Sequence, residues 1–211
     1  YYNNYANYGN PYGTVVTWVN DIMIGESTGQ RFSYISLNQT WLLINNSQNI
    51  QLYADTAYNY QAGAHITNSS GITFNGRYYD NNYGDGVIIE NSTGIVFNKW
   101  QIHNPTFSAN GWYGLYMKNV SGVTGNGLFA IGNTTFEGYG LYMDNVTNLY
   151  LSNVVVSANV RNGIHITWSQ SISLINASST GNGNNGIQTI DTNNLLMSGW
   201  LISGNQNHGV F

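Results

Sequence analysis

The stretch Gly140-Leu141-Tyr142-Met143, echoed by Gly163-Ile164-His165-Ile166, carries the pattern that decides the fold. In most repeats a glycine is followed by apolar residues one and three positions later. The glycines recur in steps of 23, 28, 26, 23, 23 and 23 residues, at Gly63, Gly86, Gly114, Gly140, Gly163, Gly186 and Gly209. An internal period of this kind is typical of repeat architectures, in which each repeat is one supersecondary unit.

A second apolar pair follows each glycine by about nine residues. Its members are Ile72/Phe74, Ile95/Phe97, Leu149/Leu151, Ile172/Leu174 and Leu195/Met197, whereas the repeat at Gly114 has Val123 but Gly125. Alternating segments of four or five residues between Asn/Gly/Ser turns predict strands rather than helices. We therefore predict a coil of three short strands per repeat, with coils stacked about 4.8 Å apart into parallel sheets and a right-handed crossover.

The repeats predict which residues face the interior. The inward columns, meaning equivalent positions in successive coils, are 64/87/115/141/164/187 and 66/89/117/143/166, and almost all are aliphatic or Met. The fold class is thus all-β, a right-handed parallel β-helix over residues 14–211. Residues 1–13 are rich in Tyr and Asn and predict an arm or linker. Because solenoids need polar caps and the chain stops at Phe211 inside a strand, we expect a fragment of a longer chain or a last coil docked on a partner.

Asparagine follows the same period. One column, after the first strand, contains Asn46, Asn68, Asn91, Asn119 and Asn145; a second, four residues before the glycine, contains Asn82, Asn110, Asn159, Asn182 and Asn205. Asn tolerates left-handed turn geometry, and its amide can bond the identical amide in the next coil. We predict two asparagine ladders whose side chains point inward.

With these columns in place, residues 40–211 resemble a right-handed parallel β-helix of the pectate-lyase-like superfamily. The resemblance rests on the repeat G-φ-x-φ … N … φ-x-φ … N-x-x-x-G, where φ is apolar. It implies the fold strongly and the function weakly, because the superfamily includes polysaccharide lyases, glycoside hydrolases, epimerases, phage and virus tail spikes, and surface adhesins.

Composition excludes several classes of function. Only 7% of residues are charged and the net charge is −4, so the five Lys+Arg residues are too few for nucleic acid to be a partner. No apolar stretch approaches the roughly 20 residues of a membrane span. There is no Cys, and the four His residues (65, 103, 165 and 208) fall in separate coils, so we predict no metal site and no cofactor.

An outer face of the predicted first sheet offers candidate chemistry. His65, Tyr116, Tyr142 and His165 form an aromatic and imidazole column, in which sugars can stack on ring faces. Two residues further on, Glu90, Lys118 and Asp144 form a charged column. Glu90 and Asp144 lie two coils apart, near the roughly 6.5–9.5 Å carboxyl separation of an inverting glycosidase. The alternative is an alternating-charge ladder in which Lys118 pairs with both neighbours.

The motifs of the superfamily's enzymes are largely missing. There is no Asp-Asp pair, and Arg occurs only at positions 31, 77 and 161. Asn207-His208-Gly209 resembles part of a polygalacturonase motif, and Tyr83-Gly84-Asp85-Gly86 resembles the start of an alginate-epimerase signature, but turn chemistry explains both. Asn-x-Ser/Thr sequons are frequent, and we expect glycans at Asn38, Asn45, Asn133 or Asn176 before the ladder positions.

Three functions remain open. The first is an extracellular recognition module, the β-helical part of a viral tail spike or surface adhesin that contacts host glycans or envelope, as a homo-oligomer or with other virion or surface subunits. The low charge and abundant sequons resemble extracellular proteins of acidophilic archaea and their viruses. The second is a polysaccharide hydrolase or lyase that uses Glu90, Asp144 and Lys118. The third is a structural stalk.

Overall fold

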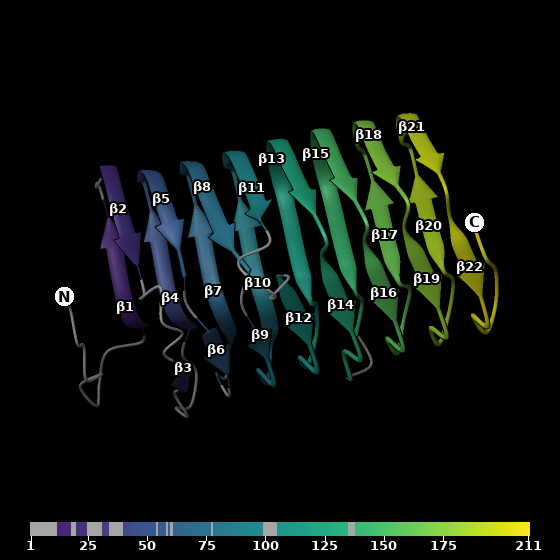
Figure 1. The fold of residues 1–211 in the computed structure, drawn as a ribbon, viewed down its shortest axis with the longest axis horizontal. Coiled ribbons are helices and arrows are strands. Elements are labelled where there is room, and N and C mark those ends of the chain that lie inside the picture. Colours follow the sequence, from purple (N-terminus) through teal and green to yellow (C-terminus); the bar gives the residue numbers. More distant parts are fainter. Residues whose placement is uncertain are drawn as a thin grey trace.

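The structure is a computed structural model that describes residues 12–17, 20–24, 31–33, 40–53, 55–57, 59, 61–76, 78–98, 105–134 and 138–211. The described residues form β-strands joined by turns, and none of them lies in a helix, so none provides a helix able to cross a membrane. The chain winds as a right-handed solenoid, and Figure 1 shows its coils side by side from β1 at one end to β22 at the other.

Each coil contributes strands to up to three columns. The first column contains β1 (Tyr12–Thr17), β4 (Thr40–Asn45), β7 (Ala62–Thr67), β10 (Asp85–Glu90), β13 (Leu115–Asn126), β15 (Leu141–Ser152), β17 (Ile164–Thr167) and β20 (Ile187–Ile190). The second contains β2 (Asn20–Ile24), β5 (Gln48–Leu52), β8 (Ser70–Asn75), β11 (Thr93–Asn98), the later parts of β13 and β15, β18 (Gln170–Ile175) and β21 (Asn193–Ser198). The third contains β3 (Arg31–Ser33), β6 (Asp55–Ala57) and β9 (Tyr79–Asp80), then β12 (Thr106–Ser108), β14 (Phe129–Ile131), β16 (Val155–Ser157), β19 (Ser178–Thr180) and β22 (Leu201–Ser203).

The register confirms the predicted stacking. Leu141 lies directly between Leu115 and Ile164 in parallel pairing, and all three side chains are fully buried. The second apolar pair also stacks in register, as in the pairing of Ile172 with both Leu149 and Leu195. The first strand begins at Tyr12, and residues 1–11 of the predicted arm lie outside the described residues.

The two longer repeats keep this register. The extra residues of the repeat at Gly86 lie between β11 and β12, since Phe97 pairs with Gly125 and Thr106 pairs with Phe129. Those of the repeat at Gly114 lie between β14 and β15, because the pairing of β14 with β16 and of β15 with β17 is unbroken. Length differences are therefore confined to connections.

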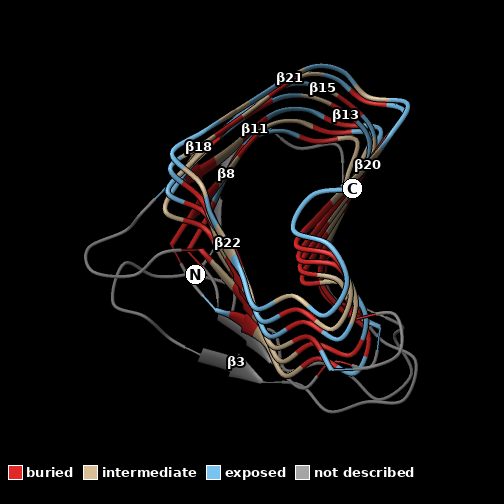
Figure 2. Ribbon diagram, turned by 90° about the vertical axis from the view of Figure 1, so that its right-hand side faces the viewer, coloured by how far each residue is buried: buried red, intermediate tan, exposed pale blue. Residues whose placement is uncertain are grey.

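Close backbone approach explains the repeating glycine. A Cβ built on Gly86 would lie 2.4 Å from the carbonyl oxygen of Gly114, and one built on Gly140 would lie 2.5 Å from that of Gly163. Any side chain here would force neighbouring coils apart. In the view down the axis (Figure 2), the backbone of each coil bends inward on the side where the chain ends, and the segment leading to the C-terminus follows that indentation.

An aromatic layer fills the middle of the core. Phe74 stacks on Phe97 with ring centroids 5.0 Å apart, and Tyr79 stacks on Phe107 at 5.6 Å. Gly125 follows Phe97 in its column; a Cβ there would lie 2.9 Å from Cδ2 of Leu151 and 3.0 Å from Cβ of Phe97. The break in the apolar pattern at Gly125 is thus a packing requirement, because its neighbours leave no room for a side chain.

The second predicted asparagine ladder is confirmed and is longer than expected. It runs through buried or nearly buried side chains, namely Asn59, Asn82, Asn110, Asn133, Asn159, Asn182 and Asn205. Each side-chain amide donates to the next one, except that the backbone N–H of Asn110 makes the link to Asn133. Oδ1 of Asn159 accepts from both the backbone N–H and Nδ2 of Asn133, at 3.2 and 2.7 Å. Because these groups are shielded from water, the ladder satisfies a corner of the solenoid that would otherwise contain unpaired donors.

The first predicted ladder exists only in part, and the expectation that it points inward is wrong. Asn119 donates to Asn91 at 2.9 Å and accepts from Asn145 at 2.8 Å, but all three side chains are exposed. Asn68 donates to Asn45 rather than to Asn46. These turn residues have φ near +50°, a left-handed conformation that directs the side chain outward while the backbone turns.

Replacing Asn159 with Ala tests the buried ladder. The change removes four hydrogen bonds that its side chain makes with Asn133, Asn182 and Ala130, and strands buried donors of Asn133. We expect a loss of about 3 kcal/mol in the free energy of unfolding, measured by urea denaturation. The control is Asn126→Ala, in an exposed pair with Asn153, which should cost under about 1 kcal/mol. Equal costs would contradict a stabilising role for the buried ladder.

Candidate functional site

Five aromatic side chains meet on one outer face of the first strand column. Tyr116, Tyr142 and His165 occupy equivalent positions in β13, β15 and β17, as predicted. Tyr113 and Tyr139 lie beside them, each just before the repeat glycine of its coil. We call these five residues the tyrosine face. Sequence reasoning did not select Tyr113 or Tyr139, although the residue that precedes each glycine forms its own column.

The rings of the tyrosine face form two adjacent stacks. In one, Tyr116 and Tyr142 have centroids 5.5 Å apart and planes 18° apart, and Tyr142 stacks on His165 at 4.7 Å and 15°. In the other, Tyr113 and Tyr139 are 5.5 Å apart at 29°. Edge or tilted contacts of 5.0–5.7 Å join the stacks. Such packing holds the rings in place and covers both faces of the Tyr142 ring, so a ligand meets a preformed aromatic surface of ordered ring edges and hydroxyls.

The two predicted histidines differ in their surroundings. His65 lies two coils before Tyr116, beyond Ile88, and therefore does not join the tyrosine face. His165 is buried, and its Nδ1 lies 3.0 Å from Oε1 of Gln188, which also accepts from Nδ2 of Asn162 at 2.7 Å. Burial lowers the pKa of His165, against a smaller opposing effect of the Gln188 hydrogen bond. The imidazole is thus held neutral and fixed at the edge of the face.

The charged column borders the tyrosine face. Glu90, Lys118 and Asp144 occupy consecutive coils, as predicted. Nζ of Lys118 lies 3.4 Å from Oδ2 of Asp144, whereas Oε2 of Glu90 lies 3.0 Å from Nε2 of His65. Lys118 therefore pairs with one carboxylate, that of Asp144, and not with both as the alternating ladder required. Each carboxylate has a different partner, and both remain partly exposed.

Asp85 is a buried carboxyl group one coil before Tyr113, at the end of the tyrosine face nearest the N-terminus. It precedes Gly86, so it belongs to the same column as Tyr113 and Tyr139. Its Oδ1 accepts the backbone N–H of Tyr113 at 2.9 Å, as Oδ1 of Asn162 accepts that of Asn185 at 3.0 Å. Burial raises the pKa of Asp85 to about 7, and the Tyr113 hydrogen bond opposes this only partly. The predicted turn role is wrong, because Asp85 is the first residue of β10 and pairs with Ala62; its carboxyl group titrates near neutrality.

The predicted glycan acceptors fall in contrasting places. Asn133 is fully buried and its Nδ2 donates to Asn159 at 2.7 Å, so a glycan there is wrong for the folded chain. Asn176 is exposed on a turn, and Asn45 is partly exposed and accepts from Asn68. Asn38, like His103, lies outside the described residues. Among the described residues, no three His, Asp or Glu side chains gather as a metal site would require.

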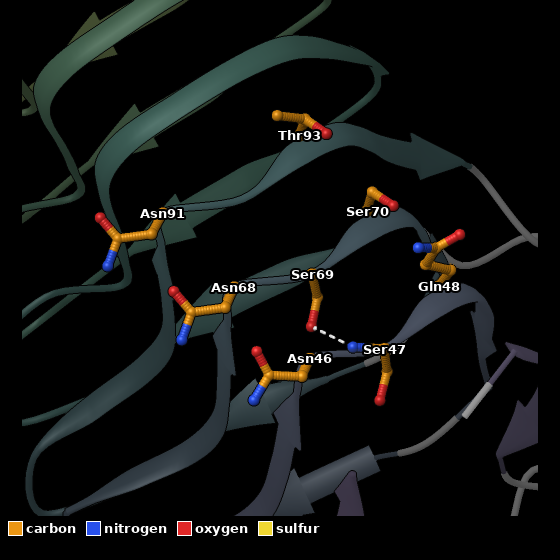
Figure 3. Close-up of a pocket in the computed structure, with 8 residues that line it drawn as sticks. All are labelled: Asn46, Ser47, Gln48, Asn68, Ser69, Ser70, Asn91 and Thr93. Carbon is orange, nitrogen blue, oxygen red and sulfur yellow. Dashed lines mark hydrogen bonds between the residues drawn. The ribbon is translucent and has the colours of Figure 1, made fainter. Parts of the chain in front are cut away.

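A polar groove lies elsewhere, over the turns between β4, β7 and β10 and the strands that follow them. It has a volume of about 550 Å³ and is lined by Asn46, Ser47, Gln48, Asn68, Ser69, Ser70, Asn91 and Thr93 (Figure 3). The backbone N–H of Ser47 donates to Oγ of Ser69 at 3.1 Å, and that of Ser69 donates to Ser92. Its buried hydroxyls are thus used to close turns. It contains none of the predicted site residues, whereas the tyrosine face contains three.

Comparison with known families identifies the architecture. The family described as "Right handed beta helix region" matches residues 98–211, which is more than half of the chain. The chain belongs to this family. The match begins at the end of β11 and includes all of the tyrosine face, so the face is built on coils of the right-handed β-helix. No curated protein sequence matches the chain.

Solved structures share this β-helix. The periplasmic alginate epimerase AlgG is 16% identical with a TM-score of 0.62, covering 94% of this chain and 46% of that one. The A-module of the Azotobacter vinelandii mannuronan C-5 epimerase AlgE4 is 9% identical with a TM-score of 0.66, covering 91% and 58%. The enzymatically active domain of bacteriophage CBA120 tailspike protein 2 is 19% identical with a TM-score of 0.59, covering 93% and 29%. This chain thus spans from under a third to just over half of each, and these likenesses show the β-helix fold.

Proposed function

We propose that this chain is an extracellular recognition module, the β-helical part of a viral tail spike or surface adhesin, and that it binds cell-surface glycan through the tyrosine face. The observation that supports it most is the double stack of Tyr113/Tyr139 and Tyr116/Tyr142 beside hydrogen-bonding groups. Sugars present C–H faces that pack on aromatic rings and hydroxyls that need fixed polar partners. The similar structures include a tailspike and polysaccharide epimerases, which is in keeping with this proposal.

The chemistry of the face fits recognition because it is rigid and already ordered. The exposed parts of the rings lie next to Lys118, Asp144 and Glu90, which supply hydrogen-bond donors and acceptors along the platform. Binding therefore costs little side-chain ordering, in contrast to a face built from long flexible residues.

Replacing Tyr116 or Tyr142 with Ala tests the proposal. Loss of one ring should weaken glycan binding roughly 5- to 30-fold, because an aromatic ring contributes on the order of 1–2 kcal/mol. Binding is measured on a broad glycan array and then by titration calorimetry. The control is Tyr150→Ala, a half-exposed tyrosine of β15 outside the face, which should bind as the parent does.

Tyr116→Phe separates binding from folding, since it keeps the ring and should retain most of the affinity. If both alanine variants stay folded by circular dichroism and bind as the parent does, the face is not the binding site. A parent chain that binds neither glycans nor cells would overturn the proposed recognition function.

A second candidate is a polysaccharide-degrading enzyme, an inverting hydrolase or lyase. Asp85 favours it, because a carboxyl group with a pKa of about 7 can donate a proton at neutral pH. In this case the parent digests a polysaccharide, and Glu90→Gln or Asp144→Asn lowers the rate at least a hundredfold in a reducing-sugar or unsaturated-product assay. Unchanged cleavage by both variants would remove those two residues from catalysis.

A further inference from the structure

Carboxylates lie along one side and at one end of the tyrosine face. Glu90 and Asp144 lie along one side, two residues beyond the Tyr116 and Tyr142 column, and Asp85 lies at the foot of the Tyr113 column. Among the described side chains, the cations near it are Lys118, whose Nζ is 3.4 Å from Asp144, and Arg161, whose Cζ lies 6.0 Å from the ring centroid of Tyr139. His65 is engaged with Glu90.

These charges give the platform a negative field. Lys118 is paired with Asp144, so Glu90 remains as a further carboxylate on that side, while Asp85, with a pKa of about 7, is only partly ionised at neutral pH. The pKa of Tyr116 is raised first by burial and then by the charges of Glu90, Asp144 and Asp85. The pKa of Tyr142 is raised by burial and by Asp144, with Lys118 opposing. The phenols of Tyr116 and Tyr142 therefore sense more negative than positive charge, and an anion bound over these two rings would sense the same repulsion.

We propose that the tyrosine face selects neutral glycans, whose sugars carry primary hydroxyls, over uronate glycans, whose sugars carry carboxylates at the same carbon. This inference rests on the proposed function and specifies its ligand class. A polyuronate chain would place a row of carboxylates beside Glu90 and Asp144, and the cation between these two residues, Lys118, is already paired with Asp144. A neutral chain of the same linkage would keep the ring stacking and could donate hydroxyls to these same carboxylates.

Matched oligosaccharides test this selection. The probes are β-1,4-mannan and cellulose oligosaccharides, each compared with the chain that differs only by oxidation at C6, namely mannuronan and cellouronan. Titration calorimetry at low salt should show the neutral member of a pair binding at least tenfold more tightly. The difference in affinity between the neutral and the uronate oligosaccharide should narrow at high salt, because screening weakens the repulsion between the carboxylates of the ligand and those of the protein. Asp144→Asn should improve uronate binding at least threefold relative to its neutral partner, since Lys118 then lacks its acid.

The outcomes separate the inference from the proposed function. Equal or tighter binding of the uronate member, abolished by Tyr142→Ala, would overturn neutral selection while leaving glycan binding at the tyrosine face intact. Absence of binding by every pair to the folded parent, together with a silent glycan array, would overturn the proposed function and this inference with it. Neutral preference that is unchanged by salt and by Asp144→Asn would show that the carboxylates do not cause it, and would overturn the inference.

Discussion

Leu141→Asp should abolish cooperative folding of the coils around β15. The side chain of Leu141 is fully buried between Leu115 and Ile164, so the new carboxylate would lie in a dry core with aliphatic neighbours above and below. Neither neighbour can accept or donate a hydrogen bond. We expect a loss of more than about 5 kcal/mol in the free energy of unfolding, a large share of the stability of a typical domain.

The matched control is Leu196→Asp, the same chemical change on an exposed leucine of β21. It should change the unfolding free energy by less than about 0.5 kcal/mol. Far-ultraviolet circular dichroism during urea denaturation measures both variants. A cooperative transition for Leu141→Asp close to that of the parent would contradict the stacked core.

Asp85→Asn should stabilise the protein above pH 7 and change little at pH 4. The pKa of Asp85 is about 7 in the folded chain, against an ordinary value of 3.8. Between these values the folded state holds a proton that the unfolded state has lost, so stability falls as pH rises from about 4 to 7. At 1.36 kcal/mol per pKa unit the full effect is roughly 4 kcal/mol. Asn keeps the oxygen that accepts the Tyr113 N–H and carries no charge. Asn162, at the equivalent position of a later coil, accepts the backbone N–H of Asn185 in this way.

The measurement is the unfolding free energy of parent and variant from pH 4 to 9. Their difference should rise towards about 4 kcal/mol through the neutral range and then level off. Asp191→Asn is the control, because Asp191 is exposed and its charge stays in water. A parent and an Asp85→Asn variant with parallel pH profiles would show that Asp85 is not a buried titrating acid.

The core was predictable because its information is periodic. Every position of an inward column requires an apolar side chain, so residues such as Val87 and Leu115 could be aligned from their spacing alone. The structure pairs these two residues as expected. The outer columns Glu90/Lys118/Asp144 and Tyr116/Tyr142/His165 followed from the same register. Strand periodicity fixes which face a residue occupies, but not which neighbour its side chain contacts.

The errors arose where the period changes or the backbone turns. Asn133 lies seven residues before Gly140 rather than four, because that repeat is longer, so its place in the buried ladder was hidden and it was mistaken for a glycan site. Asn119 is exposed because its φ of 53° turns the side chain outward, which spacing cannot show. Tyr113 and Tyr139 precede the glycines, outside the paired strand positions, so spacing alone does not show that their rings lie beside Tyr116 and Tyr142.

The two long repeats show where this protein can change without losing its shape. Their surplus residues lie between β11 and β12 and between β14 and β15, and the pairing on either side is undisturbed. The second connection leads directly into Tyr139. A foreign peptide could therefore be grafted into that corner as an exchangeable cassette, altering what the neighbouring rings encounter while the scaffold beneath them stays the same.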